Sequence, residues 1–402
     1  MMNYCYSYFK KQPMMMEEEK VVKASKAKEL MNKFYYRLMY KMGNVGAKNM
    51  KLVAFDDEIS VLGAVYTCGG VANGEMMQLK NQELQAHVSR LCVFTYRSWT
   101  GSIPGTNITT DAGWGCMIRA GQMMFANVLL SMSLENEEMA ESDEKVAEEK
   151  VRSILKLFND NSSGAESPFS IKNIVPLAYK HFNIKPGEYF RSTSIMLALD
   201  KLNDAYAPEA STQVEVVNFN DAALLLDKLY ERVYGDKPTF MSGDEIETAL
   251  VSKKWPKKVL LVLTAILGAD TPQENFKECV EYLLTLPWSR GLLGGIGGGA
   301  RYFFGTNART GNLYCLDPHS LQSSTGAASS LDSYFKKQVY ELPYEHISTS
   351  ASFAFLISNE REWARFFERV RSFESENRDN SFYCIMKKEP VVNMDDIITI
   401  SL

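Results

Sequence analysis

The segment Asp-Ala-Gly-Trp-Gly-Cys-Met-Ile-Arg-Ala-Gly-Gln-Met, residues 111–123, places Cys116 behind a Gly-Trp-Gly turn and ahead of a long helical pattern. The first backbone N–H groups of a helix have no partner within it, and the helix dipole adds about half a positive charge at that end. Both effects favour a thiolate and can lower a cysteine pKa from roughly 8.5 to about 3.5–7.5. The segment therefore predicts a nucleophilic cysteine at a helix start, with a small buried side chain as the alternative.

A nucleophilic cysteine needs a base, and the chain has four histidines. His319 lies in the sequence Tyr-Cys-Leu-Asp-Pro-His-Ser, residues 314–320, directly after an apolar, strand-like run. Pro318 fixes its own φ and restricts Asp317, so this turn should hold both side chains stiffly. A carboxylate beside an imidazole orients the ring and stabilises its protonated form. Cys116, His319 and Asp317 are thus a candidate triad, and a surface histidine is the alternative that spacing alone leaves open.

The composition is that of an ordinary globular protein, with 46% hydrophobic and 23% charged residues among 402. The formal net charge of −5 gives no indication of nucleic-acid binding. The seven cysteines stand singly, without metal-ligand spacing, which favours a reducing compartment and no zinc site. No secretory signal is visible, and the longest apolar run, 259–267, is too short to span a bilayer as a helix. We therefore expect a cytoplasmic protein without a zinc site.

The chain divides into a basic N-terminal extension, residues 1–54, and a main domain, residues 55–402, with an acidic insertion at 135–150. The extension is expected to be mobile, and an amphipathic helix for a membrane or a partner is the alternative. The alternation of patterns predicts an α+β (α/β mixed) fold with a mixed sheet against helices. Helices are expected at 78–90, 116–132, 151–158, twice within 170–202, and at 220–233, 273–284 and 359–373; strands are expected at 214–217, 259–267, 301–304, 312–316, 350–357 and 382–386.

Several motifs in one order give the chain a family resemblance. They are Phe94–Arg97, Thr110–Arg119, Gly121–Met123, Gly291–Gly295, Tyr302–Gly305 and Leu313–His319. Together they resemble the autophagins, the autophagy-related cysteine peptidases numbered four, from about residue 61 to about residue 386. The resemblance implies a papain-like cysteine protease fold with a small auxiliary domain, roughly residues 170–255, and no cofactor.

The resemblance also implies an activity: cleavage of the autophagy ubiquitin-like modifier after its C-terminal glycine. This reaction would activate the precursor and release the modifier from phosphatidylethanolamine at the autophagosomal membrane surface. Cys116 would be the nucleophile, His319 the base, Asp317 the residue that orients the base, and Tyr96 the donor to the oxyanion. Two rival interpretations remain, a protease of another ubiquitin-like modifier (the Ufm-one type) and an inactive scaffold that binds the modifier.

The resemblance further suggests which residues contact the substrate. Trp114 would form a wall of the cleft, and Tyr189 would stand where family members often carry a tryptophan. The glycine-rich run 291–299 lacks the flanking residues of a phosphate-binding loop, so nucleotide binding is not expected. The resemblance implies that a loop at this place is a mobile lid over the cleft, with a flexible surface connection as the alternative. The lid residues expected near the substrate are Gly294, Gly295, Ile296 and Gly297.

Overall fold

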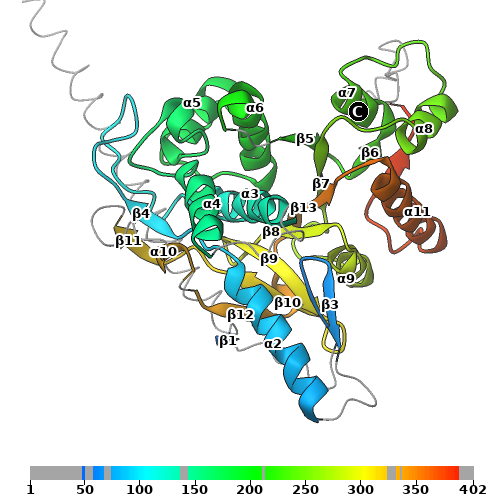
Figure 1. Ribbon diagram of the computed structural model, residues 1–402, viewed down its shortest axis with the longest axis horizontal. Helices are drawn as coiled ribbons and strands as arrows, with labels where there is room; N and C mark the ends of the chain where they lie inside the picture. The colour runs from blue at the N-terminus through cyan, green and yellow to red at the C-terminus, as the bar shows by residue number, and fades with distance from the viewer. Residues whose placement is uncertain are drawn as a thin grey trace, which may run out of the picture.

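The computed structural model describes residues 48–49, 58–67, 74–135, 144–210, 213–323, 332–335 and 337–388. These residues form a large mixed β-sheet with helices around it (Figure 1), which confirms the predicted α+β class. Except for β1 (Lys48–Asn49), the N-terminal extension lies outside the described residues, so its mobility stays a prediction. Within the described part of the chain, no helix has both the length and the apolar character needed to cross a membrane.

The main sheet is mostly antiparallel, and only β5 and β7 pair in parallel within it. Its most C-terminal strand, β13 (Ser350–Ile357), lies in the middle, between β7 (Lys258–Ile266) and β8 (Ser289–Ile296). A hairpin of β2 (Glu58–Val61) and β3 (Ala64–Thr67) joins the sheet at β9. The remaining strands of the sheet are β5 (Val214–Phe219), β9 (Gly299–Asn307), β10 (Asn312–Leu316) and β12 (Val339–Leu342), and the complete order is β1-β12-β10-β9-β8-β13-β7-β5.

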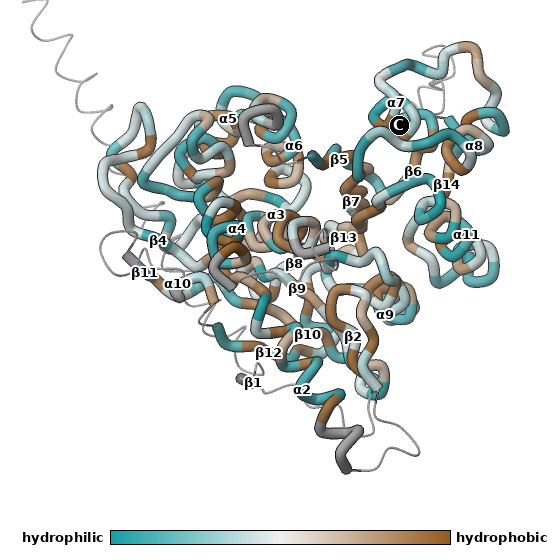
Figure 2. The backbone as a smooth tube through the Cα atoms, viewed as in Figure 1, coloured by the Kyte–Doolittle hydropathy of each residue, from teal (hydrophilic) through white to brown (hydrophobic). Residues whose placement is uncertain are grey.

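Successive side chains of a strand point to opposite faces of the sheet. Both faces are buried here, because a separate hydrophobic core packs against each of them. Leu260 and Val262 of β7 belong to one hydrophobic core, whereas Leu261 and Leu263 belong to a second. Figure 2 shows β7 as a nearly continuous hydrophobic segment. The first core includes helices α2 (Gly74–Arg90), α3 (Cys116–Glu135), α4 (Glu144–Lys156), α5 (Ile171–Phe182) and α6 (Ser192–Ala210); the second includes α7 (Leu226–Tyr234), α8 (Gly243–Ser252), α9 (Lys277–Thr285) and α11 (Glu360–Glu376).

Two small sheets and one short helix complete the described chain. Strand β4 (Tyr96–Ser98) pairs in parallel with β11 (Leu321–Ser323), close to α10 (Asp332–Phe335). Strand β14 (Cys384–Met386) pairs in parallel with β6 (Ala223–Leu225). The strand predicted at 382–386 therefore exists but is shorter and lies outside the main sheet.

The structure corrects three expectations. The helix predicted at 220–233 begins only at Leu226, because residues 223–225 form β6. The helix predicted at 151–158 begins at Glu144, inside the acidic insertion. The glycine-rich run is a β-hairpin instead of a loop, since β8 and β9 are joined by a turn at Gly297 and Gly298 with φ of 52° and 85°.

Close packing explains the glycines of this hairpin. A Cβ at Gly291 would lie 2.2 Å from the carbonyl oxygen of Phe303, and one at Gly294 would lie 3.3 Å from the Phe303 ring. Position 291 therefore requires glycine, because the Phe303 carbonyl leaves no room and the φ of Gly291 is 82°, whereas a side chain at Gly294 would only press on the Phe303 ring. The auxiliary domain expected at 170–255 contributes residues to both cores, and its boundaries stay a prediction.

Candidate active site

The turn before α3 directs Cys116 to the helix start. The backbone N–H groups of Trp114 and Gly115 donate to the Asp111 carbonyl at 3.1 and 2.9 Å. Gly113 has a φ of 88°, and a Cβ at Gly115 would lie 2.5 Å from the Asp111 carboxylate. Both glycines are therefore needed for the sharp turn. The helix begins at Cys116, which is only 2% exposed to solvent.

Asp111 braces this turn through a buried charge network. Its Oδ1 accepts the backbone N–H of Arg97 at 2.7 Å, and its Oδ2 lies 2.7 Å from Arg119 Nε. Arg119 also pairs with Asp160 at 2.7 Å. Burial raises the pKa of Asp111, while the Arg119 guanidinium opposes that rise. Paired, hydrogen-bonded charges of this kind fix geometry well, because removing one partner leaves a buried charge unpaired.

His319 and Asp317 meet directly after β10. His319 Nδ1 lies 2.5 Å from Asp317 Oδ1, which also accepts the His319 backbone N–H at 2.8 Å. On the other side of this carboxylate, Arg301 donates to Oδ2 at 3.0 Å. The Asp317 carboxylate thus lies between the imidazole of His319 and the guanidinium of Arg301, and the catalytic roles expected of Asp317 and His319 stay a prediction.

The structure brings Cys116 into hydrogen-bonding contact with His319. Burial alone would raise the pKa of the Cys116 thiol, but hydrogen bonds from His319, from the Ala300 backbone and from Tyr96 lower it overall. For His319 the effect of burial has the opposite sign and would lower its pKa, but Asp317 and Cys116 raise that pKa to about 9. These opposite shifts favour a thiolate paired with an imidazolium, which combines a nucleophile with a proton donor.

The Asp317 carboxylate stays ionised in this site. Burial acts to raise its pKa, but the hydrogen bond with His319 and the charge of Arg301 lower it to about 2. A carboxylate that is ionised at neutral pH can hold the imidazole in one orientation and stabilise its protonated form.

Tyr96 lies against both reacting groups. Its ring meets the His319 ring edge-on, with centroids 5.4 Å apart, and its hydroxyl hydrogen-bonds to Cys116. Burial and the nearby Cys116 thiolate raise the pKa of Tyr96, so the phenol remains a donor. Its backbone N–H donates to the Pro318 carbonyl at 2.9 Å, which ties β4 to the histidine turn.

The residues expected at the substrate differ in their surroundings. Trp114 is only 4% exposed, and its indole N–H donates to the Thr110 carbonyl at 3.1 Å. The Tyr189 hydroxyl donates to the Gly113 carbonyl, just before the nucleophile helix. Gly295, which lies in β8, donates its backbone N–H to Ser348 Oγ at 2.8 Å. The substrate contacts expected of these residues stay a prediction.

Three groups at the site were missed in the sequence. A Cβ at Gly299 would lie 2.9 Å from His319 Nε2, so β9 begins directly against the imidazole. The Ala300 N–H reaches Cys116, and Arg301 holds Asp317. An arginine beside the apolar run Tyr302–Phe304 was the available signal, because a buried guanidinium requires an anionic partner. Among the described residues, no group of His, Cys, Asp and Glu is arranged to hold a metal ion.

Comparison of the sequence with known proteins identifies the family of the chain. The peptidase C54 catalytic domain matches residues 81–369, more than half of the chain. The chain is 26% identical over 306 residues to the cysteine protease ATG4b of Arabidopsis thaliana, covering 74% of this chain and 62% of that protein. It is 29% identical to a probable cysteine protease atg4 of Penicillium rubens (66% and 61% covered) and 29% identical to the cysteine protease ATG4 of Candida albicans (65% and 51% covered).

The matched regions thus span between about half and just over three fifths of these relatives. The helices and mixed sheet agree with the papain-like fold expected of peptidase C54 proteins. The chain therefore belongs to the peptidase C54 family, the autophagins that its motifs resemble.

Proposed function

We propose that the chain is a cysteine peptidase that cleaves an autophagy ubiquitin-like modifier after its C-terminal glycine. The observation that carries this proposal is the buried contact of Cys116 with both His319 and Tyr96, with Asp317 behind the imidazole. The names of the matched relatives, cysteine proteases ATG4, support the same reaction class.

The chemistry follows from the protonation states. The Cys116 thiolate attacks the carbonyl carbon of the scissile amide, and the hydroxyl of Tyr96 with the Cys116 backbone N–H donates to the developing oxyanion. His319 then gives its proton to the leaving amine, the C–N bond breaks, and a thioester remains on Cys116. Neutral His319 next takes a proton from water, whose oxygen attacks the thioester carbonyl. The C–S bond then breaks, Cys116 leaves as the thiolate beside protonated His319, and the terminal glycine is released as its carboxylic acid, which loses its proton to solvent. Asp317 keeps the imidazole oriented throughout.

The same site suits both a precursor and a lipid conjugate. In each, the carbonyl belongs to the terminal glycine of the modifier, and only the leaving amine differs, a peptide N–H or the amine of phosphatidylethanolamine. Cys116 is almost fully buried, and Gly299 presses on the imidazole, so a narrow glycine tail fits better than a side chain. Trp114, Tyr189, Gly294, Gly295, Ile296 and Gly297 are the proposed neighbours of that tail.

The proposal also concerns the cellular location of the enzyme and its division into domains. The enzyme would work in the cytoplasm and would meet the autophagosomal membrane surface through its lipid-linked substrate. Residues 55–402 would form the protease domain with an auxiliary part at about 170–255, and residues 1–54 would form the extension.

The test is cleavage of a modifier precursor that carries residues beyond the terminal glycine. We expect the parent to cut after the glycine and Cys116→Ala to be inert. Cys384→Ala, the control, replaces an exposed cysteine outside the candidate site and should cut like the parent. A Ufm-type precursor and a phosphatidylethanolamine conjugate complete the panel. Cleavage of only the Ufm-type precursor would replace the proposed substrate. Binding of the modifier without any cleavage, also after removal of residues 1–54, would indicate a scaffold.

A further inference from the structure

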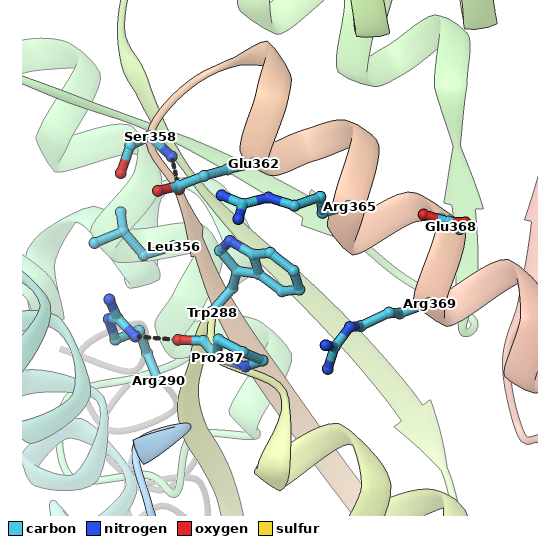
Figure 3. Close-up of a pocket in the computed structure, with 9 residues that line it drawn as sticks. All are labelled: Pro287, Trp288, Arg290, Leu356, Ser358, Glu362, Arg365, Glu368 and Arg369. Atoms are coloured by element: carbon cyan, nitrogen blue, oxygen red, sulfur yellow. Dashed lines mark hydrogen bonds between the residues drawn. The ribbon is translucent and has the colours of Figure 1, made fainter. Parts of the chain in front are cut away.

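A pocket lies between α11 and the beginning of β8, away from the candidate active site (Figure 3). Its volume is about 460 Å³, within the usual range of ligand pockets. Three arginines line it: Arg290 from β8, and Arg365 and Arg369 from α11. The chain as a whole carries a net charge of −5, so this concentration of guanidinium groups does not follow from general basicity.

The two helix arginines are available for a ligand. Arg365 and Arg369 are four residues apart on α11 and therefore lie on one helix face, about 5–6 Å apart at their Cβ atoms. Within the described part of the chain, neither side chain has a carboxylate in ion-pair contact. Two carboxylates also line the pocket, and one of them, Glu362, already accepts the Ser358 backbone N–H at 2.8 Å. The other, Glu368, lies apart from Trp288 in Figure 3.

Trp288 forms the centre of the pocket. The guanidinium carbons of Arg365 and Arg369 each lie 6.0 Å from its ring centroid, and Phe366 packs edge-on against the same ring at 5.7 Å. In Figure 3 the two helix arginines extend toward the indole from one side, and Arg290 lies on the other. The two helix arginines thus share the indole as a common contact, whereas Arg290 Nη1 donates to the carbonyl oxygens of Pro287 and Ser289 at 3.4 and 2.9 Å.

This pocket is separate from the candidate active site. Strand β8 begins at Ser289, beside the pocket, and ends at Ile296, before the turn that leads to Gly299 at His319. Eight residues of strand span about 25 Å. A ligand here would not touch Cys116, and changes to the arginines should leave the peptidase site intact.

We propose that the pocket binds a phosphorylated serine or threonine side chain of a partner peptide. A phosphate monoester carries close to two negative charges and three acceptor oxygens, which matches the paired guanidinium groups of Arg365 and Arg369 beside Trp288. Arginine clusters are a recurring means of recognising phosphorylated motifs. A membrane lipid fits less well because the site is recessed, Trp288 is only 7% exposed, and none of the exposed large hydrophobic residues among those described lines it.

The proposal is tested with a peptide library that has a fixed central phosphoserine and randomised flanks, and with matched libraries that carry serine or glutamate there. Binding to the full chain is measured by fluorescence anisotropy, with inorganic phosphate as a competitor. We expect the phosphoserine library to bind at least about tenfold more tightly than the serine library. The double variant Arg365→Gln/Arg369→Gln should lose at least about tenfold in affinity, which corresponds to roughly 1.4 kcal/mol.

Arg361→Gln is the matched control, because Arg361 is exposed on the same helix and does not line the pocket. It should bind like the parent, and all variants should keep the parent melting temperature and peptidase activity. If the double variant melts early, the single variants Arg365→Gln and Arg369→Gln provide the same test, and each should weaken phosphoserine binding. Equal affinity for phosphoserine and serine libraries overturns the proposal, as does unchanged binding by the arginine variants. Binding only to phosphatidylcholine vesicles that contain phosphatidylinositol 4-phosphate would also overturn it, in favour of a membrane site.

Discussion

Arg301→Met removes the cation that faces Asp317 from the side opposite His319. The side chains of Arg301 and Asp317 are 1% and 6% exposed, with 3.0 Å between Nη2 and Oδ2. At that distance, an effective dielectric constant of about 20 gives an attraction of roughly 5 kcal/mol. Deleting one partner of a buried pair typically costs about 3–5 kcal/mol. Because His319 remains as a second partner of the carboxylate, we expect a loss of about 3 kcal/mol in the free energy of unfolding.

The pH dependence distinguishes this loss from a simple packing defect. The pKa of Asp317 is about 2 in the folded protein, below the unfolded value of 3.8. Its stabilising contribution is therefore complete above about pH 4 and is lost as the pH falls through about 2. Without Arg301 the folded pKa rises, and the contribution shrinks. Urea unfolding of parent and variant should differ most near neutral pH, and the difference should diminish toward pH 2.

Two further variants make the test specific. Arg301→Lys keeps the charge and should recover much of the stability at neutral pH. Arg371→Met breaks a surface pair with Glu247, in which the arginine side chain is 53% exposed, and should cost less than about 1 kcal/mol. An Arg301→Met protein as stable as Arg371→Met at pH 7 would refute the reasoning.

Three other predictions concern the reacting groups. Iodoacetamide should modify Cys116 near neutral pH, because its pKa is lowered. Cys384 is exposed, but partial desolvation raises its pKa, so its reaction rate should rise toward alkaline pH. Mass spectrometry that finds the same pH profile for both cysteines would contradict the ion pair. Tyr96→Phe should lower kcat by about 10²–10³-fold with little change in melting temperature, and a kcat near that of the parent would exclude the phenol as an oxyanion donor. Gly299→Ala should displace the His319 ring, since the new Cβ would lie 2.9 Å from it, and reduce kcat/KM by about 10²-fold; full activity would show that the ring has room to move.

Local sequence was sufficient to predict two local features of the candidate site. Cys116 lies at the start of its helix, and Asp317 contacts His319, because a helix start and a proline turn are determined by neighbouring residues. The strand β7 was predicted from a continuous apolar run, since a strand buried on both faces needs one.

Pairings between distant segments could not be predicted in this way. The contacts of Arg301 with Asp317 and of Arg119 with Asp160 depend on which strands and loops become neighbours. The glycine-rich run was misinterpreted for a related reason. Glycine composition indicates freedom when the surroundings are unknown, but Gly291 is required by the Phe303 carbonyl of the adjacent strand.

The position of β13 has a consequence for synthesis of the chain. Because this strand fills the gap between β7 and β8, a growing chain that ends before residue 350 leaves two apolar strand edges unpaired. Such edges readily pair with other chains. The emerging polypeptide is thus most exposed to aggregation, and most in need of a chaperone, while about the first 350 residues have left the ribosome. Fusion partners or truncations that delay or remove β13 should give insoluble protein.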